Sequence, residues 1–279
     1  MLKIEICCTS IDAALVAQKY GAHRIELCSE LFLGGITPSI GLIESCIKEL
    51  KIPIRVLLRP RGGNFNYSNN EIKVIINDII RLKDLGVEGL VLGLTNENGS
   101  IPKSKMEKIL NTVDGKMKLT FHRAFDYLKK PIQELKTLTD FGFDTILTSG
   151  RKKTAYEGII YINKLRKAAR DKILIMPGGG INSENFNSFK VYKYKWIHLS
   201  AKKQLNSGDE EQIEISFKRQ PIYNIDIDNL KKINHQNKGW LPAKGLLNKP
   251  NASFVHKRKN KWILKVEIKV NLFLKAPTW

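Results

Sequence analysis

Three ionisable side chains follow a short apolar segment in the middle of the chain. Residues 119–126 read Leu-Thr-Phe-His-Arg-Ala-Phe-Asp, so His122, Arg123 and Asp126 lie within five positions. Alternate side chains of a strand share a face, which pairs Thr120 with His122 and leaves Arg123 and Asp126 in the following loop. His122 and Asp126 are candidate acid/base groups, and Arg123 is a candidate anion ligand. The alternative is a buried ion-pair cluster that fixes the loop.

Arginine and glycine recur after other strand-like segments. The run 59–63 reads Arg-Pro-Arg-Gly-Gly, and planar guanidinium groups suit an anion held by two hydrogen bonds. Residues 178–180 are three glycines that we expect to open a helix, where backbone N–H groups receive phosphate in many barrels; the alternative is a tight turn. A serine ends another strand. The predicted anion-binding residues are Arg59, Arg61, Arg123, Ser149, Gly178, Gly179 and Gly180.

Cys7 and Cys28 are the candidate metal ligands. They end the first two strand-like segments with side chains on one face, and soft thiolates select Cu(I). The sequence has no Cys-x-x-Cys, and no histidine pair has the spacing of metal ligands, so two inert free thiols are the alternative. We expect Cys8 and Cys46 to be packing residues, and all four cysteines to be free thiols in a reducing compartment.

Charged residues also occur at positions expected to face inward. Glu26 shares a face with Cys28 and is the third candidate acid/base group. Barrel interiors are usually aliphatic, so the alternative is a buried network in which glutamates neutralise Arg24 and Arg55. His198 is interpreted as a satisfied core histidine.

The elements that position these residues alternate regularly. Strand-like runs begin near residues 3, 23, 54, 89, 118, 145, 173 and 196, and amphipathic helical segments separate them. The last helix is predicted over 222–233. Eight such units indicate an α/β fold, a (β/α)₈ TIM-type barrel whose strands present their carboxyl ends on one face. A doubly wound open sheet is the alternative, but the first turn lacks Gly-x-Gly-x-x-Gly.

The basic excess concentrates at the end of the chain. The net charge is +20, and residues 235–279 carry ten Lys and Arg against one acidic residue. We therefore predict a barrel domain over 1–233 and a basic appendage over 234–279, with a strand-like stretch at 264–270. No nucleic-acid motif accompanies the charge, so nucleic acid is not the expected partner. No apolar run approaches the roughly 20 residues of a membrane span, and no secretory segment precedes residue 5, so we expect a cytoplasmic protein without a membrane partner.

Seven motifs in this order resemble the CutC family. The resemblance runs from residue 1 to about 233 and implies a TIM-type barrel, a cytosolic location, self-association into a homo-oligomer, and copper homeostasis with Cu(I) binding. The tail departs from the family pattern. The motifs are Glu5–Cys7, Gly21–Cys28, Gly34–Ser39, Arg59–Gly63, Phe121–Asp126, Leu147–Gly150 and Gly178–Asn182.

Two functions remain open at this point. The first is a copper-handling protein that binds Cu(I) through Cys7 and Cys28. The second is an enzyme, a lyase, isomerase or hydrolase, acting on a small anionic or phosphorylated substrate at the carboxyl-terminal mouth of the barrel. In the second case His122 or Glu26 acts as acid or base. The fold alone does not decide between them.

Overall fold

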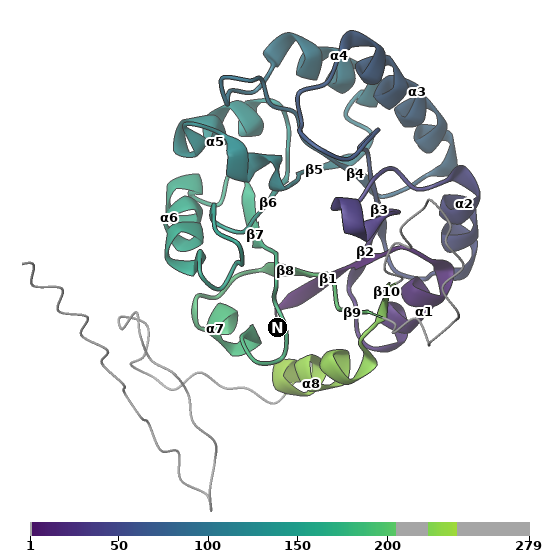
Figure 1. Cartoon of the computed structure of the whole chain (residues 1–279), viewed down its shortest axis with the longest axis vertical. Helices are drawn as coiled ribbons and strands as arrows, with labels where there is room; N and C mark the ends of the chain where they lie inside the picture. Colours follow the sequence, from purple (N-terminus) through teal and green to yellow (C-terminus); the bar gives the residue numbers. More distant parts are fainter. Residues whose placement is uncertain (1, 205–222, 239–279) are drawn as a thin grey trace, which may run out of the picture. The chain divides into compact units, whose positions relative to one another are not determined.

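Eight parallel strands form the inner wall of a barrel, and α1 to α7 surround it (Figure 1). The computed structural model describes residues 2–204 and 223–238. The strands are β1 (Lys3–Cys8), β2 (Arg24–Leu27), β3 (Ile54–Leu57), β4 (Gly89–Leu92), β5 (Lys118–Phe121), β6 (Thr145–Thr148), β7 (Leu174–Pro177) and β8 (Trp196–Leu199). The helices are α1 (Ile11–Lys19), α2 (Ile40–Glu49), α3 (Asn69–Leu85), α4 (Lys103–Val113), α5 (Pro131–Asp140), α6 (Ile159–Ala169), α7 (Phe186–Val191) and α8 (Ile227–Lys238).

The strands pair in sequence order, which confirms the predicted (β/α)₈ barrel. Hydrogen-bonded ladders run from β8 through β1 to β7, and a parallel bridge between Gly178 and His198 joins β7 to β8. This closure requires glycine, because a Cβ at Gly178 would lie 2.4 Å from Leu147 Cδ1 and 3.0 Å from His198 Cβ. The bridge therefore brings the end of β7 directly against the histidine of β8.

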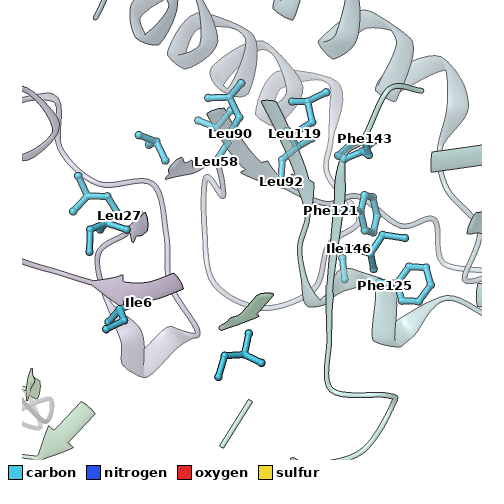
Figure 2. Close-up of a cluster of buried hydrophobic side chains, with 14 of the residues drawn as sticks. Ile6, Leu27, Leu58, Leu90, Leu92, Leu119, Phe121, Phe125, Phe143 and Ile146 are labelled. Carbon is cyan, nitrogen blue, oxygen red and sulfur yellow. The ribbon is translucent and has the colours of Figure 1, made fainter. Parts of the chain in front are cut away.

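The hydrophobic core lies between the strands and the surrounding helices. Alternate strand residues, such as Ile6 of β1 and Leu27 of β2, face outward into it (Figure 2). Phe121, at the end of β5, joins the same cluster. Because strand side chains alternate, the residues between these face the barrel interior. A small separate cluster of Cys7, Cys28, Leu57 and Val91 lies on that inner side.

An ion-pair network occupies the barrel interior near the amino ends of the strands. Arg24 Nε donates to Glu5 Oε2 at 2.6 Å. Arg55 Nε donates to Glu88 Oε2 at 3.1 Å, and its Nη2 donates to Asp144 Oδ1 at 3.0 Å. The ion-pair alternative is confirmed for Arg24, which meets Glu5. Arg55 is also neutralised, but by Glu88 and Asp144 rather than by an inward-facing strand glutamate, and neither guanidinium lines the cavity at the strand ends.

Serine side chains begin several helices, as their N-cap chemistry predicts. Ser10 Oγ accepts from Ala13 N at the start of α1. The cap of α3 is Ser68, whose side chain accepts from Glu71 N. The side chain of Glu71, the third helical residue, accepts from the Ser68 N–H in return, which completes a reciprocal capping box.

The last described elements differ from the prediction. The segment expected to be one helix over 222–233 is a short strand, β10 (Tyr223–Ile225), followed by α8. β10 pairs antiparallel with β9 (Lys202–Gln204). Asp226 Oδ1 then accepts from Asn229 N at 2.9 Å, and this cap explains why the helix begins only at Ile227.

The carboxyl end of α8 is held against the barrel. Asn237 Nδ2 donates to Leu2 O at 2.8 Å, and Gln236 Nε2 donates to Ser183 O at 3.0 Å. These contacts lie beyond residue 233, where we predicted the domain to end. The boundary stays a prediction, and the strand-like stretch predicted at 264–270 lies outside the described residues. Among the described helices, none combines the length and apolar character that a bilayer span requires.

Candidate functional site

A cavity of about 270 Å³ opens at the carboxyl ends of the strands. One wall comes from β8, β1 and β2 and carries Cys7, Glu26, Cys28 and His198. The other wall comes from the segments after β5 and β7 and carries His122, Arg123, Gly179 and Gly180. Leu31, Leu57, Phe65 and Leu147 line the space between them. The volume is near the low end for ligand pockets and suits a small metabolite or an ion.

The two candidate thiols are in contact on the first wall. Cys7 Sγ and Cys28 Sγ lie 3.1 Å apart, and both side chains are buried. The hydrogen bond to Cys28, together with burial, raises the pKa of the Cys7 thiol well above its ordinary value. Cys8 instead packs among the outward-facing core residues, and Cys46 does the same from α2. Only the first two cysteines line the cavity.

A histidine lies between two carboxylates beside these thiols. His198 Nδ1 lies 2.9 Å from Glu5 Oε1, and its Nε2 lies 3.5 Å from Glu26 Oε2. Burial alone would lower the pKa of His198, but Glu26 and Glu5 outweigh it and raise that pKa above its ordinary value. Burial raises the pKa of Glu26, although the nearby His198 opposes part of the rise.

These side chains form a set with metal-ligand spacing. Cys7 Sγ, a carboxylate oxygen of Glu26 and a ring nitrogen of His198 all lie within 4.8 Å of one another. Histidine ligands usually donate their other ring N–H to a carboxylate, which is the relation of His198 to Glu5. The donor set is mixed, with sulfur, nitrogen and oxygen, and Cys28 adds a second sulfur. A soft metal ion fits the sulfur end of this set.

His122 presents a hydrogen-bond donor rather than a base. Its Nδ1 accepts from Ala124 N at 3.1 Å, so the neutral ring carries its proton on Nε2. Burial, with repulsion from the Arg59 guanidinium, lowers the pKa of His122 to about 3. The Nδ1–Cε1 edge packs against Gly93, and Nε2 has no hydrogen-bond partner among the described residues. This geometry favours a hydrogen-bond donor role for His122 over the predicted acid/base role.

Asp126 is fully used in holding the loop after β6. Its Oδ2 accepts from Arg123 Nε at 3.1 Å, from Ser149 N at 3.1 Å and from Ser149 Oγ at 3.0 Å. Its Oδ1 accepts from Thr148 Oγ1, and from Arg151 N at 3.1 Å. A carboxylate with five such donors has no lone pair left for a substrate proton, so this geometry does not support acid/base catalysis. The loop-fixing alternative describes Asp126 and Ser149 better.

Arg123 lines the cavity, and only two of its three guanidinium nitrogens bond to protein groups in the described part of the chain. Nε bonds Asp126, and Nη2 donates to Ser149 Oγ at 2.8 Å. Nη1 has no acceptor within the described ranges 2–204 and 223–238. It lies beside Gly179, where an added Cβ would stand 3.3 Å from Nη1. Arg123 is thus oriented by protein groups while Nη1 remains available.

The other two predicted arginines are occupied by loop carbonyls. Arg61 directs its five N–H groups at Glu71 and at oxygens of residues 62, 64 and 66, and it does not line the cavity. Arg59 lines the cavity, but its Nη1 donates to Leu33 O and Gly35 O, both at 2.7 Å. The anion-binding prediction is therefore not supported by the geometry of Arg61, and Arg59 chiefly holds the loop after β2.

The glycine loop lines the cavity without starting a helix. α7 begins at Phe186, six residues after Gly180, because Asn182 Oδ1 caps a turn by accepting from Glu184 N and Asn185 N. Gly178 serves the barrel closure. Gly180, at φ +68°, has no acceptor for its N–H among the residues described.

Sequence reasoning did not place His198 or Glu5 in the site. The signal was present, because His198 shares a strand face with Ser200, which also lines the cavity. Their pairing depends on the register of β1 against β8, in which Glu5 faces His198. Phe65, whose ring centroid lies 4.9 Å from that of His122, was also absent from the candidates.

Comparison with known proteins agrees with this architecture. The protein CutC of Glaesserella parasuis serovar 5 is 41% identical over 207 residues, which are 74% of this chain and 85% of that protein. A crystal structure of a protein named for copper homeostasis, CutC from Streptococcus agalactiae, matches with a TM-score of 0.68 at 33% identity, covering 72% of this chain and 99% of that one. An aldolase, QR15, at 14% identity and a TM-score of 0.50, covers 71% of this chain and 89% of that one and shows the fold alone. The model of the CutC family matches residues 2–203, and this chain belongs to that family.

Proposed function

We propose that this protein binds Cu(I) through Cys7 and Cys28 and acts in copper homeostasis, the role for which its relative is named. The observation that carries the proposal is the contact of two buried thiols, 3.1 Å apart, on the wall of a cavity. Soft thiolates prefer Cu(I), and the copper is cargo rather than a resident cofactor. Two sulfurs already side by side require little rearrangement to share one ion.

The neighbouring groups support exchange of protons for copper. Because the pKa of Cys7 is raised, its thiol is protonated at neutral pH, and binding of Cu(I) must release that proton. We expect apparent affinity to rise with pH for this reason. The nearby carboxylate of Glu26 and the imidazole of His198 offer acceptors beside the sulfur, and Glu5 orients the imidazole.

Cellular context follows from the same chemistry. Free thiols persist in a reducing compartment, which supports a cytosolic location. We also propose a homo-oligomer, as family membership implies. Light scattering of the purified full chain tests this, and a monomeric mass contradicts it.

A Cu(I) competition experiment tests the proposal. Purified protein is titrated without oxygen against a chromophoric Cu(I) chelator. C7S/C28S is expected to lose affinity by more than the ~10–100-fold that outer-shell changes cause, because it removes both soft ligands. The matched control is C8A/C46A, which removes two buried thiols outside the cavity and leaves affinity unchanged. Equal affinity of C7S/C28S and wild type rejects the assignment.

A second candidate function is catalysis on a small anionic substrate. It is favoured by one observation, that the unpaired donor Nε2 of His122 and the carboxylate of Glu26 belong to facing walls of the same cavity. Cavities at this end of a barrel commonly hold substrates. Incubation of wild type and E26Q with small carbonyl phosphates in D₂O, followed by NMR, tests it. Solvent exchange that wild type catalyses and E26Q does not supports catalysis, and no exchange with any of them contradicts it.

A further inference from the structure

Three hydrogen-bond donors belong to residues that line the cavity wall opposite the thiols, and the described residues supply none of them with an acceptor. They are Nη1 of Arg123, the Nε2–H of His122 and the backbone N–H of Gly180. His122 is 6% exposed, so an unmet donor there carries the desolvation cost of a buried polar group. Buried donors are normally satisfied, so His122 Nε2 indicates an acceptor in the cavity, while the more exposed Arg123 and Gly180 offer their donors beside it.

We propose that His122, Arg123 and Gly180 bind one small oxyanion, a carboxylate or a phosphate monoester. The two side-chain donors are fixed by contacts that do not use their donating atoms. Ala124 N fixes the tautomer of His122, and Asp126 fixes Arg123 through Nε. Donors held in this way lose little entropy when the ligand arrives.

The charges of the two walls set the orientation of the ligand. Glu26 lies on the first wall and repels an anion, whereas Arg123 on the second wall attracts it. The rest of the ligand then meets Cys7, Cys28 and Leu57, which are uncharged. In a cavity of about 270 Å³ the ligand is a small metabolite with one anionic end and a short uncharged body.

This site is separate from the proposed copper ligands in both residues and strands. It uses β5 and the loop after β7, while the thiols end β1 and β2. Binding of a bare anion such as phosphate at these donors therefore requires neither the thiols nor copper, and the two proposals fail independently. Phosphate affinity that is the same in C7S/C28S and wild type is the expected sign of this separation.

Selective labelling makes the glycine loop directly visible by NMR. Labelling the full-length chain with carbonyl-¹³C and amide-¹⁵N glycine selects amides that follow another glycine, which in this sequence are Gly35, Gly63, Gly179 and Gly180. Inorganic phosphate and acetate are titrated separately in the absence of metal. We expect a saturable shift at Gly180 with at least one of them, and no shift at Gly63. The anion that binds more tightly identifies the phosphate or carboxylate source.

Two variants assign the contacts, and a third is the control. H122F keeps an aromatic ring against Phe65 but removes the donor, and R123Q removes the charge; each should weaken binding by about 10-fold or more. R81Q removes an exposed arginine of α3 and should bind as wild type does. An unchanged amide signal of Gly35 shows that each variant is folded. If R123Q does not fold, the result for H122F alone tests the proposal. No saturable shift at Gly180 with either anion, or wild-type affinity in a folded H122F, overturns the proposal.

Discussion

Replacing Glu5 by glutamine should show how strongly the buried ion-pair network inside the barrel depends on one charge. Burial would raise the pKa of Glu5, but Arg24 and then His198 outweigh it and lower that pKa from 4.5 to about 2. At about 1.4 kcal/mol per pKa unit, the ionised form is favoured in the folded state by roughly 3 kcal/mol. The loss of a partner from a buried ion pair costs about 3–5 kcal/mol, which agrees. We therefore expect E5Q to lose about 3 kcal/mol of unfolding free energy at pH 7.

Urea unfolding at several pH values tests both the size and the sign. Because the folded-state pKa of Glu5 is depressed, its contribution is complete above pH 4.5 and is lost as the pH falls from 4.5 towards about 2. The difference between wild type and E5Q should therefore be constant from pH 7 to pH 5 and shrink below. E107Q, on the exposed face of α4, controls for glutamate substitution in general. A loss for E5Q below about 1 kcal/mol at pH 7, or one that grows on acidification, refutes the reasoning.

Three further predictions concern the second wall and the end of the barrel. G93A should lose about 1–3 kcal/mol in urea unfolding, because the added Cβ would lie 2.6 Å from His122 Cε1 and Nδ1; unchanged stability contradicts the packing. The pKa of His122 is lowered from 6.5 to about 3, so the neutral ring costs no stability above pH 6.5, and the folded state loses stability as the pH falls from 6.5 towards 3. ¹⁵N NMR at pH 5 should therefore show a neutral His122 ring, and an imidazolium at that pH contradicts the prediction. A chain ending after Ile233 should melt below one ending after Lys238, because it lacks Asn237 and its bond to Leu2 O; equal midpoints would support the boundary at 233.

The fold could be predicted because strand side chains alternate between two environments. Outward positions such as Ile6 and Phe121 pack against helices, and this pattern survives in the sequence as an apolar residue at every second position. Several inward positions, such as Glu26 and Arg59, carry charged instead of aliphatic residues, and this departure indicates that the site lies on the inner face of the strands. Local signals of this kind depend on neighbours only a few residues away.

Which inward groups stay available could not be predicted, because that depends on the paths of loops. Arg61 and Arg123 look equivalent in sequence, yet carbonyls of its own loop occupy Arg61 while Arg123 retains Nη1. The sequence around Asp126 predicts an acid/base group, because several of the donors that occupy its carboxylate come from residues 22 to 25 positions away and leave no local signal. His198 meets Glu5 only because of the register in which β8 pairs with β1, and that register cannot be read from either strand alone.

The bond between Glu5 and His198 joins residues 193 positions apart, which has a consequence for the newborn chain. Both candidate thiols are synthesised among the first 28 residues, but the wall that buries them is completed only when β8 is made. At about 5–20 residues per second, synthesis of the intervening chain takes roughly 10–40 s. During that interval Cys7 and Cys28 are open to oxidants and to any metal ion present. For the proposed Cu(I) site, loading then depends on timing during translation as well as on affinity in the finished barrel.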